Sequence, residues 1–147
     1  MNHKIGDFFS EDEVGQITEA VRNAELNTSG EIRLHIEKQC PEKDVLDRTA
    51  KIFAELGMHK TQLRNGVLIY LAFDHRKFAI IGDAGINHVV EAGFWDSTRD
   101  IMQHHFKQGQ FVTGLVKGIE LAGENLKKHF PFHKDDINEL SDEISIG

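Results

Sequence analysis

Cysteine and proline are almost absent from this chain of 147 residues, and both absences narrow what it can be. Cys40 is the single cysteine, which excludes an internal disulfide and a cysteine-based zinc site. Two prolines, with 39% hydrophobic and 28% charged residues, are typical of a globular protein rather than a disordered or fibrous one. No apolar run reaches the ~20 residues of a membrane helix, and the first residues lack the apolar stretch of a signal peptide. We therefore expect a cytoplasmic protein without a membrane partner.

Basic residues are also scarce, with 17 Lys and Arg against 24 Asp and Glu, a net charge of -7. Such a chain has no positive field to attract polyanions, so we predict that nucleic acid is not a partner. An acidic field favours divalent cations, although acidity alone is common in soluble proteins. The charge therefore permits metal binding without implying it.

Several catalytic and binding motifs are missing. The chain has no G-x-x-x-x-G-K-[ST] or G-x-G-x-x-G loop for phosphates and no H-E-x-x-H metal motif. Its acidic end lacks the residue order of an EF-hand calcium loop. Nucleotide hydrolysis is unsupported, and any calcium site must be built by the fold.

Apolar residues at helical spacing predict four long helices. The first begins after Ser10, where Glu13 can complete a capping box. The other three are expected over 44–56, from 96 or 97 to 109, and over 111–130. The last contains Gly114 and Gly118 one turn apart, which we interpret as a smooth patch for close packing on a sheet.

Three segments have the patterns of strands. Residues 31–37 alternate between apolar and charged side chains, which predicts a half-buried strand, at an edge or covered on one face. Residues 67–73 are apolar throughout, which predicts a central strand covered on both faces. Residues 78–81 return after a four-residue polar turn.

These elements define the predicted fold. The first strand, the helix over 44–56 and the second strand form a β-α-β unit with parallel strands, and the third strand returns antiparallel. We expect an α/β three-layer sandwich, a central mixed sheet with helices on both faces. A single domain over 1–131 would be followed by an acidic tail over 132–147, either a loosely docked arm or a solvated end.

This topology brings three polar segments to one sheet edge. They are the start of the first strand with Glu31, the start of the second with Asn65, and the end of the third with Asp83. Two carboxylates and an amide are the oxygen ligands that calcium prefers, with magnesium or manganese as alternatives. Asp96 adds a third carboxylate if the loop after the third strand folds back. The predicted metal ligands are thus Glu31, Asn65, Asp83 and Asp96.

The same residues also have a purely structural interpretation. Asp83 and Asn65 can cap turns, Glu31 can pair with Arg64, and Asp96 can cap a helix. Arg64 also places a cation at this edge, where it could bind a phosphate or carboxylate bridged by the metal.

A general rule favours the opposite edge, because open α/β sheets bind ligands at the carboxyl ends of parallel strands. Cys40 and His75 are expected there and could form a nucleophile pair. We favour the simpler interpretation, in which a lone cysteine after a strand is an inert small residue.

Four stretches carry a resemblance to a known family: Gly30-Glu31-Ile32, 64–69, 82–86 and the glycine-marked stretch from Phe106 to Gly118. In this order and spacing they resemble the TPM domain, over about 9–130. The family is named for a thylakoid lumen protein, a photosystem II repair protein and a nematode receptor-associated protein. The resemblance implies an α/β sandwich and, for some members, calcium binding and acid phosphatase activity without a shared nucleophile. Many members carry a signal peptide, a membrane helix and a glycine-rich tail, none of which we expect here. Arg64 also stands where an acidic residue often precedes Asn-Gly.

Two functions follow as hypotheses. The first is a small soluble module that binds a divalent cation, calcium above all, at the sheet edge and meets a protein partner through its tail or last helix. The alternative is a metal-assisted phosphomonoesterase, in which the cation polarises phosphate, Arg64 stabilises charge and a carboxylate positions water. No catalytic residue is identified by motif, and a purely structural role stays open.

Overall fold

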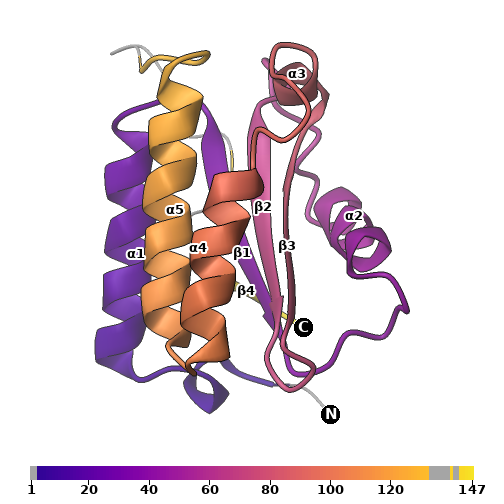
Figure 1. The fold of residues 1–147 in the computed structure, drawn as a ribbon, viewed down its shortest axis with the longest axis vertical. Coiled ribbons are helices and arrows are strands. Elements are labelled where there is room, and N and C mark those ends of the chain that lie inside the picture. Colours follow the sequence, from indigo (N-terminus) through magenta and orange to yellow (C-terminus); the bar gives the residue numbers. More distant parts are fainter. Residues whose placement is uncertain (1–2, 133–139, 141–142) are drawn as a thin grey trace.

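The computed structural model describes residues 3–132, 140 and 143–147. They form three layers, with a sheet in the middle and helices on both sides (Figure 1). The sheet has the strand order β3-β2-β1-β4. Its strands are β1 (Glu31–Glu37), β2 (Gly66–Ala72), β3 (Lys77–Gly82) and β4 (Ser145–Ile146). β1 is parallel to β2 and β4, and β2 is antiparallel to β3. The predicted β-α-β unit and hairpin are confirmed, and β2 is central as expected.

Helices cover both faces of the sheet, which confirms the α/β sandwich (Figure 1). One face carries α1 (Glu11–Glu25), α4 (Asp96–Lys107) and α5 (Phe111–Lys127), and the other carries α2 (Val45–Glu55). Two short elements, η1 (Ile5–Asp7) and α3 (Ala84–Asn87), complete the described helices. The capping box at Ser10 and Glu13 starts α1 as predicted. No helix in the described ranges is long and apolar enough to cross a membrane.

The larger core lies between the sheet and the three-helix face. Alternate residues of β1 belong to this core: Ile32, Leu34 and Ile36 are 1%, 2% and 0% exposed. Because successive side chains of a strand point to opposite faces, the positions between them are left for the α2 face. The apolar half of the predicted alternation is therefore confirmed.

The charged half of β1 differs from the expectation. Glu31, His35 and Glu37 are 5%, 4% and 4% exposed, so β1 is buried on both faces rather than half-buried. The physical reason is that side chains from distant parts of the chain pack over the charged face of β1. α2 supplies Arg48 to Glu37, and the chain end supplies Ser145 to His35.

The glycines of α5 pack closely, but not on the sheet as expected. A Cβ added at Gly114 would lie 2.5 Å from Cε1 of Phe106, and one at Gly118 would lie 2.5 Å from Sδ of Met102. Both neighbours belong to α4, so the smooth patch lets α4 and α5 approach each other.

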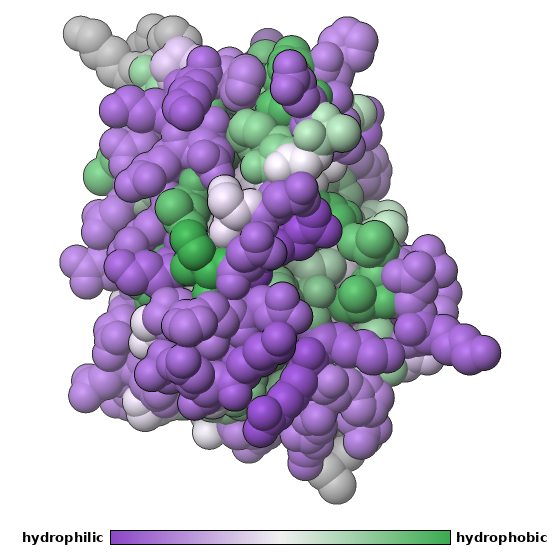
Figure 2. Space-filling view, in the orientation of Figure 1, coloured by the Kyte–Doolittle hydropathy of each residue, from purple (hydrophilic) through white to green (hydrophobic). Residues whose placement is uncertain are grey.

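The chain end forms a strand that the sequence did not predict. Ser145 and Ile146 pair with His35 and Ile36 on the outer edge of β1. Residues 133–139 and 141–142 of the acidic tail lie outside the described residues. The face of the molecule drawn in Figure 2 is mostly hydrophilic, with small separate hydrophobic patches.

Candidate functional site

The three predicted segments do converge at one edge of the sheet. At the start of the two parallel strands, Glu31 is in register with Gly66. Backbone hydrogen bonds tie the segments together: Glu31 N donates to Asn65 O at 3.3 Å, and Asp83 N donates to Gly66 O at 2.9 Å. We call this end of the sheet the amino edge, because the parallel strands β1 and β2 begin there.

Asp83 is held by an arginine at this edge. Arg64 donates two hydrogen bonds to the carboxylate, from Nε to Oδ2 at 2.7 Å and from Nη2 to Oδ1 at 2.8 Å. Asp83 is 6% exposed and also caps α3 by accepting from Ala84 N at 2.7 Å. The hydrogen bonds to Asp83 raise the pKa of Arg64, so it is a permanent cation. The capping role expected for Asp83 is confirmed, and the ion-pair partner of Arg64 is Asp83 rather than Glu31.

The backbone around Arg64 is tightly built. Arg64 has a φ of 53°, in the left-handed region that L residues seldom adopt. Gly85 N donates to Arg64 O at 2.8 Å, and a Cβ at Gly85 would collide with the carbonyl oxygen of Leu63. Only glycine therefore lets the loop before β2 pack against the start of α3.

Glu31 and Asn65 are buried but face different neighbours. They are 5% and 3% exposed. Oε1 of Glu31 accepts from Leu140 N at 2.9 Å, on the α2 side of the sheet. Asn65 Nδ2 lies 3.5 Å from Oγ of Ser29. The amino edge thus brings together three of the predicted oxygen ligands, but their side chains do not all point to one place.

Asp96 stands apart from this group. It lies in the first turn of α4, where Trp95 occupies the cap position, and it pairs with Arg99. Its side chain is 61% exposed. Within the described residues, no hydrogen bond or ion pair joins Asp96 to the other three predicted ligands, and no group of three or more His, Cys, Asp and Glu is placed to hold a metal ion.

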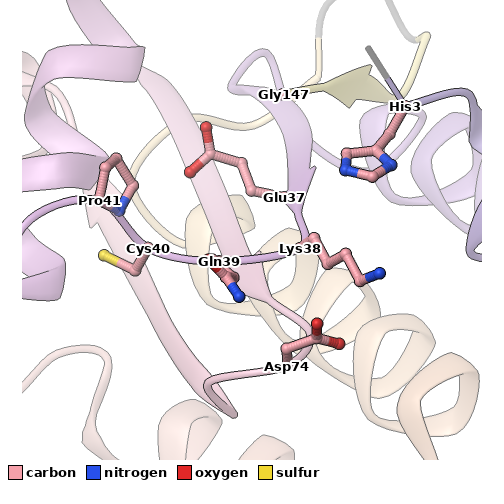
Figure 3. Close-up of a pocket in the computed structure, with 8 residues that line it drawn as sticks. All are labelled: His3, Glu37, Lys38, Gln39, Cys40, Pro41, Asp74 and Gly147. Atoms are coloured by element: carbon pink, nitrogen blue, oxygen red, sulfur yellow. The ribbon is translucent and has the colours of Figure 1, made fainter. Parts of the chain in front are cut away.

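The opposite edge, where β1 and β2 end, contains an open pocket of about 540 Å³. Figure 3 shows its lining, in which the carboxylates of Glu37 and Asp74 lie apart from each other. Cys40 is 6% exposed, its thiol donates to Glu42 O at 3.3 Å, and its backbone N donates to His75 Nδ1 at 3.0 Å. His75 therefore contacts the backbone of Cys40, which supports the interpretation of an inert cysteine.

A buried polar network beside this pocket was missed at the sequence level. Glu37 accepts from Arg48 Nε at 3.0 Å and from the hydroxyl of Tyr70, and His35 Nε2 lies 3.2 Å from its Oε1. Burial raises the pKa of Glu37, but the hydrogen bonds from His35, Arg48 and Tyr70 outweigh it and lower the pKa to about 2. The available signal was the run of charged residues on one face of β1, but nothing local marked Arg48 as its partner.

The fold and the two edges define an α/β sandwich with a polar, glycine-marked amino edge. The family model of the TPM domain matches residues 5–125, so the chain belongs to the TPM domain family. This confirms the family resemblance seen in the sequence.

Solved structures support the same fold. The NMR structure of BA42 from the psychrophilic bacterium Bizionia argentinensis is 53% identical, covers 98% of this chain and 99% of its own, and has a TM-score of 0.90. An N-terminal domain from P. gingivalis is 20% identical over 88% of this chain and 84% of its own, with a TM-score of 0.71. The N-terminal domain of cg2496 from Corynebacterium glutamicum is 14% identical over 82% and 75%, with a TM-score of 0.66. The last two show the fold alone. No curated protein matches the chain significantly.

Proposed function

We propose that this TPM domain binds a divalent cation, calcium above all, at the amino edge. The observation that carries the proposal is the burial of three oxygen-bearing side chains from separate segments at one edge: Glu31, Asn65 and Asp83 are 5%, 3% and 6% exposed. Burying carboxylates is costly unless a cation compensates them. An edge that concentrates such groups is therefore suited to a hard cation.

Arg64 compensates the charge of Asp83 in this structure. Its side chain is 48% exposed, whereas that of Asp83 is 5% exposed, so the arginine can leave for water while the carboxylate stays. A calcium ion bound to Asp83 would replace the guanidinium, and Asn65 and Glu31 would supply further oxygens after side-chain rotation. Binding is then an exchange of one cation for another, and Arg64 lowers the apparent affinity.

A calcium titration followed by amide NMR tests the proposal. We expect saturable shifts at residues 31, 64–66 and 82–85, and their loss in Asp83→Asn. Arg64→Gln should bind more tightly than wild type, because the competing cation is gone.

The matched control is Arg99→Gln, which frees the exposed carboxylate of Asp96 in the same way. It should leave the calcium affinity unchanged, because Asp96 lies apart from the amino edge. Absence of shifts at the amino edge in both wild type and Arg64→Gln would exclude the site.

A metal-assisted phosphomonoesterase is the second candidate, favoured by one observation. The cation exchange would release a half-exposed arginine beside the bound metal, and such a pair suits a phosphate group. Turnover of a generic aryl phosphate with added calcium, magnesium or manganese, lost in Asp83→Asn and in Arg64→Gln, would support this activity. Calcium binding without turnover would leave the binding module as the function.

A further inference from the structure

The outer edge of β1 is covered by a very short strand. β4 pairs with His35 and Ile36 only, and Gly147 N donates to Ile36 O at 2.9 Å. A strand edge exposes backbone donors and acceptors that can pair with another extended segment. The backbone contact here is therefore of the kind that strand addition uses.

Side chains give this contact a sequence preference. Ile144 and Ile146 pack against the larger core, while Ser145 Oγ lies 2.8 Å from His35 Nδ1 on the opposite face. This alternation matches the two-residue period of a strand. The edge accepts an apolar residue, a serine and a second apolar residue in that order.

The following position accepts only glycine. A Cβ at Gly147 would collide with Oε1 of Glu37 and lie 2.8 Å from Nε2 of His35. Glu37 cannot move aside easily, because Arg48 and Tyr70 fix its carboxylate. The contact thus selects the residue type at four consecutive positions, in the order apolar, Ser, apolar and Gly.

We propose that the outer edge of β1 is a strand-accepting site for this pattern, occupied here by residues 144–147 and able to bind the same segment of a second copy of the chain. These contacts do not depend on the segment belonging to the same polypeptide. Effective concentrations of tethered segments are in general on the order of millimolar, so exchange in trans requires a weakened cis contact or concentrated protein. Two chains that exchange segments in this way form a domain-swapped pair.

The test uses a variant of the full chain in which the contact of residues 144–147 with β1 is weakened. In ¹⁵N-labelled Ile146→Asp, a peptide of residues 140–147 should bind saturably and shift the amides of residues 35–37. The same peptide with Gly147→Ala should bind at least about tenfold more weakly, because its methyl group meets Glu37. Unlabelled wild-type chain at about millimolar concentration, the regime of the effective-concentration argument, should shift the same signals. All samples contain a chelator of divalent cations, so that the result does not depend on the proposed cation site.

Ile101→Asp is the matched control, because it places the same substitution on the exposed side of α4, where Ile101 is 37% exposed. Its own segment stays docked, so the peptide should produce much smaller shifts. If Ile146→Asp loses its dispersed spectrum, Ser145→Ala replaces it as the weakened variant. No shifts in either weakened variant, or equal binding of the Gly147→Ala peptide, would overturn the site. Binding of the peptide but not of the wild-type chain would overturn the second copy as its occupant.

Discussion

Replacing Glu37 with glutamine separates the contribution of a buried charge from that of packing. The side chain of Glu37 is 5% exposed and is surrounded by Arg48, Tyr70 and His35. Glutamine keeps the shape of the side chain but removes its charge. Arg48 then lies beside a neutral amide, with its side chain only 19% exposed.

The size and sign of the effect follow from the pKa of Glu37. Its pKa is lowered from 4.5 to about 2 in the folded protein. A lowering of this size corresponds to about 3 kcal/mol, at roughly 1.4 kcal/mol per pH unit. Because the folded pKa lies below the unfolded one, the stabilisation is complete above pH 4.5 and is lost as the pH falls toward 2.

Urea unfolding at pH 7 and pH 3 measures this directly. We expect Glu37→Gln to lower the free energy of unfolding by about 3 to 5 kcal/mol at pH 7, as for other broken buried pairs. The difference from wild type should shrink by about 2 kcal/mol at pH 3, where much of the charge contribution is already lost. Glu42→Gln breaks an exposed pair with Lys51 and is the matched control, with an expected effect below about 1 kcal/mol. An equal difference between wild type and Glu37→Gln at the two pH values would refute the electrostatic explanation.

The remaining predictions concern glycines. Gly114→Ala should destabilise by about 1 to 3 kcal/mol in urea unfolding, because the ring of Phe106 is packed between other aromatic rings and cannot yield. Gly118→Ala should cost less, since its neighbour is the flexible side chain of Met102; an equal or larger loss would contradict this ranking. Gly85→Ala should destabilise by more than about 1 kcal/mol and shift the amide signals of residues 63–66, because its Cβ would meet backbone carbonyls that cannot rotate away. Unchanged signals at these residues would contradict the close approach of α3 to the loop before β2.

Local patterns predicted most of the fold. The capping box of α1, the alternation of β1 and the apolar run of β2 are properties of neighbouring residues, and each gave an element close to the observed one. The convergence at the amino edge followed from strand direction alone, without any contact being known. Periodicity and topology therefore sufficed for the scaffold.

Contacts between distant segments were not predictable in this way. The burial of Glu37 depends on Arg48, which lies in another element, and that of His35 on Ser145, which lies 110 positions later. Ser145–Ile146 is too short to show a strand period. The choice of Asp83 over Glu31 by Arg64 likewise depends on side-chain direction, which topology does not fix.

The two edges of the sheet use the same chemistry with different consequences. At each edge an arginine makes two hydrogen bonds to a buried carboxylate, Arg48 to Glu37 and Arg64 to Asp83. The side chain of Arg48 is 19% exposed, and its partner Glu37 has two further partners, Tyr70 and His35. The side chain of Arg64 is 48% exposed. Both carboxylates have side chains that are 5% exposed, so either would become an uncompensated buried charge if its arginine moved away. Arg64 is already half in water and would lose less on leaving, and Asp83 would then need another cation. The exposure of Arg64 is thus the reason why the proposed cation exchange is placed at the amino edge, although the hydrogen-bond geometries at the two edges are alike.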